Sequence, residues 1–256
     1  MSGLIGYDSL YVASGVTVTA SGESTDYEKE NAYDWKQYDW WADTTVTSGD
    51  TWIRASFAAA QDADYMIIFG HNLSDVGGSV KPQYSTNGGT SWSDADTAVT
   101  PTDNNTIFIS FTSVSAADWR VLVSVTTDYA VIGGVMIGEA LEFDKDVISG
   151  FRPPTLSPDI ESRAPMSEMG VNIGVSKIRT GISGTISLPN VSASWVRNSW
   201  QGLIDHLNNG YPCGFMWDSV NYPDETCLIW KDGNISKPAH SSKNLMQIEL
   251  RYMGVL

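Results

Sequence analysis

The stretch Trp119-Arg120-Val121-Leu122-Val123-Ser124-Val125 alternates in the manner of a half-buried β-strand, and it sets the pattern for the first half of the chain. Further strands are expected at residues 16–19, 51–57, 80–85, 106–111 and 130–138, and the fully apolar run 65–70 fits a strand of the core. Asn87-Gly88-Gly89 supplies the positive-φ positions of a tight hairpin between two of them. Leu10-Tyr11-Val12 is expected to extend the first strand. Short strands separated by turn residues predict a jelly-roll β-sandwich over residues 1–142.

The second half has a different pattern. Pro153, Pro154 and Pro158 exclude a helix and predict an extended linker or arm over residues 143–158. One helix is expected at 192–209, since Val196, Trp200, Leu203, Ile204 and Leu207 form one apolar face. Ser192 or Ser194 can cap its start, and Asn209-Gly210 ends it. The expected fold class is therefore mainly β, with a jelly roll followed by a second β-sandwich, residues 159–256, that carries one α-helix.

Charge divides the chain at the same place. Of its 256 residues, the first 142 hold 19 acidic and 5 basic residues, a net charge of −14, whereas residues 143–256 hold 11 acidic and 10 basic residues, a net of −1. The strong negative charge of the first half argues against nucleic acid and anionic membranes as partners. No apolar run is long enough for a membrane helix, and the N-terminus does not resemble a signal peptide, so we expect synthesis in a cytoplasm without membrane insertion.

Motifs of catalysis are missing from the sequence. His71, His206 and His240 stand apart from one another, and the sequence contains neither a metalloprotease HExxH, nor a hydrolase GxSxG, nor a P-loop. We therefore expect a protein that is not an enzyme. Cys213 and Cys227 could bridge across a hairpin or stay as two buried thiols, and the sequence leaves both open.

An acidic, loop-rich segment follows the first strand. Glu23, Asp26, Glu28 and Asp34 are candidate ligands for a structural calcium ion, because calcium prefers carboxylates and carbonyls of irregular loops. The alternative is a solvated acidic loop without metal. No other cofactor is expected.

Aromatic residues crowd the same segment. Trp35, Trp40 and Trp41 could pack in the core of the jelly roll, anchor a protein interface or stack on a sugar ring.

Several stretches of the first half together resemble a known domain. Glu30-Asn31-Ala32-Tyr33-Asp34 with Trp40-Trp41, then Trp52-Ile53, Trp119-Arg120-Val121 and Ile132-Gly133-Gly134-Val135, are similar to discoidin-type, galactose-binding-like jelly rolls over residues 10–142. That family often carries a structural calcium. The chain lacks the Gly that follows the aspartate in the family pattern and the paired cysteines. Ser85–Trp92 also resembles the Asp-box hairpin of sialidases, with Asn87 in the Asp position.

The layout of the whole chain resembles a tail component of tailed bacteriophages, similar to the distal tail (baseplate) proteins. This resemblance implies a virion structural protein, put together in the host cytoplasm, that forms a ring, a hexamer, and connects the tail tube to peripheral tail proteins. Arg152, Pro153 and Pro154 would form an arm that reaches a neighbouring copy. The alternative function is a carbohydrate-binding module that recognises host-surface glycan.

Overall fold

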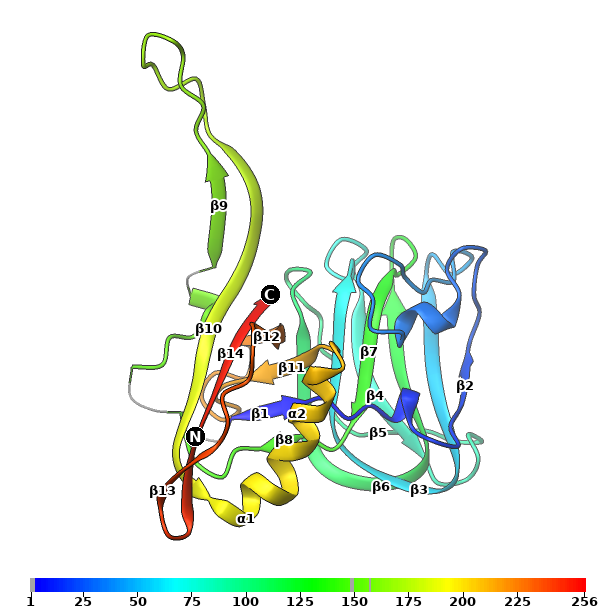
Figure 1. Ribbon diagram of the computed structural model, residues 1–256. Coiled ribbons are helices and arrows are strands. Elements are labelled where there is room, and N and C mark those ends of the chain that lie inside the picture. The colour runs from blue at the N-terminus through cyan, green and yellow to red at the C-terminus, as the bar shows by residue number, and fades with distance from the viewer. Residues whose placement is uncertain (1–2, 148–149, 157) are drawn as a thin grey trace.

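The computed structural model describes residues 3–147, 150–156 and 158–256. It has two lobes side by side and one long hairpin that projects from the second lobe (Figure 1). The expected mainly β class with a single packed helix is confirmed.

The first lobe is built from one six-stranded antiparallel sheet in the order β2-β3-β6-β4-β5, with β7 paired to β3. Its strands are β2 (Thr17–Ala20), β3 (Gly49–His71), β4 (Ser79–Ser85), β5 (Ser93–Asp94), β6 (Ile107–Val125) and β7 (Ile132–Gly138).

The sheet forms a sandwich because its two longest strands bend. The expected strands at 51–57 and 65–70 are the two halves of β3, and those at 106–111 and 119–125 are the two halves of β6. Register shifts between Ser56 and Gln61 mark the bend. Side chains from both halves, such as Ile53 and Met66, meet in one buried core.

Residues 10–12 differ from expectation, since Leu10–Val12 forms a 3-10 turn and only Thr17–Ala20 is a strand. The turn directs Tyr11 into the core, where its hydroxyl donates to the Ile53 carbonyl oxygen at 2.9 Å. Burial of this ring stabilises the fold more than three further residues of strand would.

The second lobe contains an eight-stranded antiparallel sheet in the order β8-β1-β11-β12-β14-β10-β9, with β13 paired to β14. Its strands are β1 (Leu4–Gly6), β8 (Leu141–Glu142), β9 (Asp159–Arg163), β10 (Ser176–Ser192), β11 (Cys213–Met216), β12 (Thr226–Lys231), β13 (Ala239–Ser242) and β14 (Leu245–Val255).

The middle of this sheet is buried on both faces. On β11 and β12, Phe215 and Ile229 face a core shared with the helix, whereas Met216 and Leu228 face the jelly roll. Ile67 and its neighbours on β3 pack against Met216 and Leu228 from the jelly-roll side. The two lobes therefore pack through a continuous apolar layer, which explains why the run 65–70 is apolar at every position.

The expected boundary at residue 142 does not match the sheets. β1 pairs with β11, and β8 pairs with β1, so both ends of the segment 1–142 lie in the second sheet. Ile5 and Leu141 are buried in the helix-side core, which holds these strands there. The jelly roll is thus inserted between the first strand of the second lobe and the rest of it.

The helix lies close to its expected range. α1 (Ala193–Trp195) continues through a π-helical turn, Val196–Trp200, into α2 (Gln201–Asn208). The Ser192 hydroxyl accepts from the Trp195 backbone N–H at 3.4 Å, as expected of an N-cap, and Gly210 follows with φ +84°. Trp200, Leu203 and Leu207 are buried against the sheet.

The projecting element is not the expected proline segment. Pro154 is buried, and Pro154–Leu156 forms a 3-10 turn against the second lobe. Residues 148, 149 and 157 of the expected linker lie outside the described residues. The element that extends away is the hairpin of β9 and the first part of β10, residues 159–181, which we call the arm (Figure 1).

Candidate functional site

The three candidate tryptophans have three different environments. Trp41 is buried in the jelly-roll core, where its indole N–H donates to the Gly22 carbonyl oxygen at 3.0 Å. Trp35 packs against the second lobe. Trp40 is 39% exposed, and the neighbouring Tyr38 is 73% exposed. Tyr38 and Trp40 are therefore the exposed rings of this segment, and we call residues 34–41 the aromatic loop.

The aromatic loop combines flat rings with charged groups. Lys36 is paired with Asp34 and lies 3.4 Å from an Asp39 carboxylate oxygen, and its amine is 5.7 Å from the centre of the Tyr38 ring. Asn31 donates to the Trp40 carbonyl oxygen at 3.0 Å. Rings flanked by hydrogen-bonding side chains are suited to binding a sugar, which presents an apolar face and a rim of hydroxyls.

Trp35 occupies the position of the missing glycine. Its φ is +68°, a conformation that favours glycine and costs a bulky residue about 1–2 kcal/mol. The ring stacks on Tyr211 at 5.4 Å between centroids and meets the His206 ring edge-on at 5.3 Å. Contact between the lobes therefore holds Trp35 in this conformation.

The four candidate calcium ligands do not come together. Glu23 accepts from Lys29, through both the backbone N–H and the side chain, and these bonds lower the pKa of Glu23. Asp34 is paired with Lys36 instead. Within the part of the chain that the structure describes, no group of three or more His, Cys, Asp or Glu side chains is placed to hold a metal.

A second aromatic cluster, which the sequence analysis did not single out as a site, lies on the outer face of the jelly-roll sheet. The Arg120 guanidinium lies 4.1 Å from the centre of the Trp92 ring and 5.9 Å from that of Trp52. Its Nε donates to the Gln83 side-chain oxygen at 2.7 Å, and Gln83 donates to Asp94. The alternation of 119–125 places Arg120 on the outer face, but its ring partners come from other strands.

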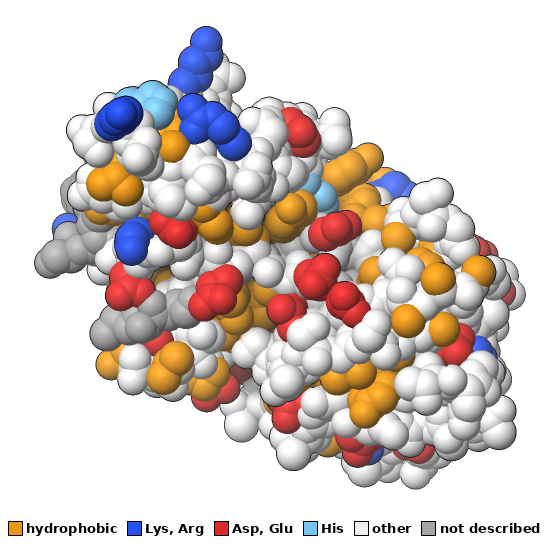
Figure 2. Space-filling view, turned by 90° about the horizontal axis from the view of Figure 1, so that it is seen from below, with side chains coloured by type: hydrophobic (Ala, Val, Ile, Leu, Met, Phe, Trp, Pro, Cys, Tyr) orange, Lys and Arg blue, Asp and Glu red, His pale blue; other side chains and the backbone are white. Residues whose placement is uncertain are grey.

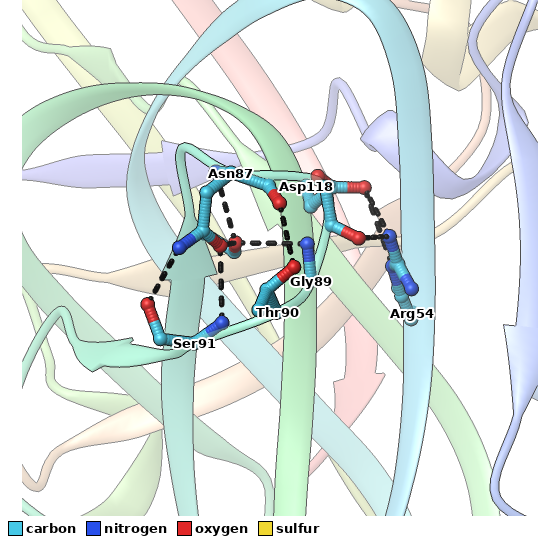
Figure 3. Close-up of polar contacts among 8 residues, drawn as sticks. Arg54, Asn87, Gly89, Thr90, Ser91 and Asp118 are labelled. Atoms are coloured by element: carbon cyan, nitrogen blue, oxygen red, sulfur yellow. Dashed lines mark hydrogen bonds and ion pairs between the residues drawn. The ribbon is translucent and has the colours of Figure 1, made fainter.

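The Asp-box-like hairpin is confirmed between β4 and β5 (Figure 3). Asn87 Oδ1 accepts from the Ser91 backbone N–H at 3.0 Å, and Gly88 and Gly89 have φ +72° and +82°. Beside the hairpin, Arg54 donates to Asp118 at 2.7 Å and to the Gly88 carbonyl oxygen at 3.1 Å. These hydrogen bonds close the turn, so the residues of the hairpin have a structural role.

Acidic side chains gather where the two lobes meet (Figure 2). Burial, followed by the negative charges of Asp62, Asp64 and Asp8, raises the pKa of Glu139. Burial also raises the pKa of Asp64, although its carboxylate accepts from the Ala140 backbone N–H at 2.7 Å. The cluster adds to the negative field of the jelly roll.

Two cysteines and a histidine are buried outside these clusters. Cys213 and Cys227 are free thiols in the core, and burial raises the pKa of both. His71 contacts the Asn105 carbonyl oxygen at 2.8 Å, and burial lowers its pKa. No described helix has the length and apolar character needed to cross a membrane.

Comparison with known proteins finds similarity to solved structures only. No protein-family model matches the chain, and no curated protein matches its sequence. Solved structures match about half of it. A GH29 fucosidase of Ruminococcus gnavus in complex with fucose is 15% identical, with a TM-score of 0.45 over 52% of this chain and 27% of that protein. The match thus spans about a quarter of the fucosidase's own length.

Two isolated binding modules match over nearly their whole length. Chitosan-binding module 1 of a chitosanase/glucanase from Paenibacillus sp. IK-5 is 21% identical, with a TM-score of 0.42 over 51% of this chain and 98% of that module. A Clostridium perfringens module in complex with GalNAc-β-1,3-galactose is 13% identical, with a TM-score of 0.41 over 48% and 94%. These modules are what the first half of the chain is similar to, and similarities of this size carry no argument about a ligand.

Proposed function

We propose that this chain is a non-catalytic binding protein whose jelly roll recognises carbohydrate through the aromatic loop. The observation that carries the proposal is the pair of exposed rings, Tyr38 and Trp40, with Lys36 and two carboxylates beside them. Aromatic faces stack on the apolar face of a sugar, and the charged groups can bond its hydroxyls.

Charge narrows the class of glycan. The net charge of −14 over residues 1–142 repels uronic acids and sulfated sugars, so the proposed ligand is a neutral or amino-bearing glycan.

A glycan array with the full-length protein tests this function. The wild type should bind a set of neutral or amino sugars, and Trp40→Ala and Tyr38→Ala should each reduce the signal, by about 1–3 kcal/mol of binding free energy for a central aromatic contact. Tyr222→Ala removes an exposed ring from the second lobe and should leave binding unchanged. Equal glycan binding by the wild type and all three variants would show that the aromatic loop does not bind the glycan.

A second candidate function is assembly, as a ring-forming structural protein of a phage tail tip. The observation that favours it is the arm, an extended hairpin with exposed apolar side chains that a solitary binding module does not need. Negative-stain electron microscopy of the full chain should show rings, alone or on addition of tail-tube protein. Single dispersed particles under both conditions would contradict this candidate.

A further inference from the structure

The aromatic loop contacts both lobes. Just before the loop, the ring of Tyr33 stacks on a buried tyrosine of the jelly-roll core at 6.2 Å between centroids. At the end of the loop, Trp41 is buried and exchanges two backbone hydrogen bonds with Ile132 of β7, at 2.9 and 3.0 Å. Between these two anchors, Trp35 packs on Tyr211 of the second lobe. The conformation of the loop therefore depends on both lobes.

The contact with the second lobe offsets strain in the loop backbone. Trp35 has a φ of +68°, a conformation that bulky residues avoid. Its ring lies 5.4 Å from the Tyr211 ring with 26° between the planes, and the His206 ring meets it edge-on. Aromatic pairs in these arrangements attract each other beyond the effect of their buried area. Loss of the Tyr211 ring would therefore weaken what holds Trp35 in this conformation.

A series of contacts runs from the turn at Trp35 to the exposed Tyr38 ring. Across the turn, the Lys36 backbone N–H donates to an Asp34 carboxylate oxygen at 3.0 Å, and the Lys36 amine is paired with the same carboxylate. The amine also lies 3.4 Å from an Asp39 carboxylate oxygen and 5.7 Å from the centre of the Tyr38 ring. A change of backbone conformation at Trp35 would therefore shift Lys36 and, with it, Tyr38.

Trp40 has supports of its own on the jelly roll. Its carbonyl oxygen accepts from Asn31 at 3.0 Å, and its ring lies over Gly133 of β7, where an added Cβ would stand 3.3 Å from Trp40 Cδ1. The jelly roll therefore sets the position of Trp40, whereas Tyr38 is the exposed ring that depends on the second lobe.

We infer that Tyr211 of the second lobe is a positioning residue of the glycan site, which acts through Trp35 to hold the Tyr38 ring in place for binding. The inference rests on the proposed function of the aromatic loop, and it adds that the jelly roll needs the second lobe for full affinity. A ring that is already held in place loses less conformational freedom on binding, so releasing it lowers the affinity without removing a contact.

Trypsin cleavage after Lys36 tests the positioning without a ligand. Proteases cleave segments that open locally, so full-length Tyr211→Ala should be cut after Lys36 several-fold faster than the wild type, as followed by mass spectrometry of that fragment. Tyr211→Phe keeps the stacked ring and should be cut like the wild type. Cleavage after Arg120, within β6, reports unfolding of the jelly roll and should not change. Equal cleavage of Tyr211→Ala and the wild type after Lys36 would overturn the inference.

Tyr222→Ala is the matched control for the loss of a stacked tyrosine. Tyr222 stacks on Trp217 at 5.2 Å within the second lobe, and its exposed fraction of 48% is close to the 39% of Tyr211. Tyr222→Ala should be cut after Lys36 at the rate of the wild type. Equally fast cleavage of Tyr222→Ala and Tyr211→Ala would attribute the effect to general destabilisation and overturn the inference.

Dose-dependent binding to printed oligosaccharides of galactose, glucose and glucosamine tests the consequence for the site. Full-length Tyr211→Ala should bind roughly three- to tenfold more weakly than the wild type, whereas Tyr211→Phe and Tyr222→Ala should bind like it. The double variant Tyr38→Ala/Tyr211→Ala should bind no more weakly than Tyr38→Ala alone, because both changes act through one ring. A double variant clearly weaker than Tyr38→Ala would overturn the route through Tyr38.

The outcomes separate this inference from the proposed function. Full binding by Tyr211→Ala, together with a loss in Trp40→Ala, would overturn the inference and leave the glycan site in place. A wild type that binds none of the printed oligosaccharides would overturn the proposed function, and this inference with it.

Discussion

Trp35 shows how a single residue can combine backbone strain with a contact between lobes. Its φ of +68° suits glycine, yet its ring stacks on Tyr211 and contacts His206. We predict that both Trp35→Ala and Trp35→Gly lose the stacking, but that Trp35→Gly is the more stable of the two by about 1 kcal/mol, because only glycine adopts this conformation without strain. Urea unfolding of the two variants measures the difference. Equal stabilities would mean that the backbone relaxes once the ring is gone.

Arg54 and Asp118 form a part-buried ion pair in which the carboxylate is buried, with side-chain exposures of 23% and 5%. Arg54→Met keeps the aliphatic stem but leaves the Asp118 carboxylate buried without its cation, and should cost about 2–4 kcal/mol of unfolding free energy. Lys81→Met breaks the pair with Asp94, whose side chain is 48% exposed, and should cost less than about 1 kcal/mol. Similar losses in both variants would show that burial does not set the strength of the first pair.

At the scale of elements, α2 meets the aromatic loop through His206. The ring contacts Tyr7, Trp35 and Tyr211, and a ring nitrogen lies 2.8 Å from the Pro212 carbonyl oxygen. Burial lowers the pKa of His206 below its ordinary 6.5. The unfolded chain therefore takes up a proton first as the pH falls below ~6.5, and the folded state loses stability from that point down to the folded pKa.

His206→Gln tests this linkage, because glutamine keeps a hydrogen-bond donor for Pro212 but does not titrate. We predict that the wild type loses more unfolding free energy than His206→Gln between about pH 7.5 and about pH 5, measured by urea titration. His71, whose pKa is lowered in the same direction, is present in both proteins and cancels in the comparison. Parallel losses in the two proteins would contradict a role for His206.

The strands show where local sequence is informative and where it is not. Alternation located both halves of β6 and the first half of β3, because period-two burial is a property of a few adjacent residues, and the fully apolar run 65–70 located the second half of β3. It could not show that 51–57 and 65–70 form one bent strand, since the bend depends on pairing with residues more than 40 positions away. The helix was located well because its cap, apolar face and Gly210 stop are all local.

For the whole molecule, the insertion of the jelly roll could not be read from the sequence. β1 is three residues long, and its pairing with β11 joins positions more than 200 apart. The site was predictable only in part for the same reason. The sequence located the aromatic residues, but which rings are buried depends on tertiary packing, so Trp41 lies in the core while Trp40 remains exposed.

Calcium dependence is also a property of the whole molecule. Glu23 and Asp34 are each paired with lysine, and no metal-binding group gathers among the described residues. We predict that adding millimolar calcium, or a chelator, leaves the thermal midpoint unchanged in differential scanning calorimetry. A calcium-dependent rise of several degrees, as saturation of a tight site would give, would instead support a structural calcium in the acidic segment.

Native affinity electrophoresis tests the central claim, carbohydrate recognition by the aromatic loop, most directly. The full-length protein should be retarded in gels that contain a neutral or amino-bearing polysaccharide, and far less in gels with an acidic one. Trp40→Ala should run at the mobility of the sugar-free gel, while Tyr222→Ala should be retarded like the wild type. Unchanged mobility of the wild type in every polysaccharide, or equal retardation of Trp40→Ala, would contradict the account.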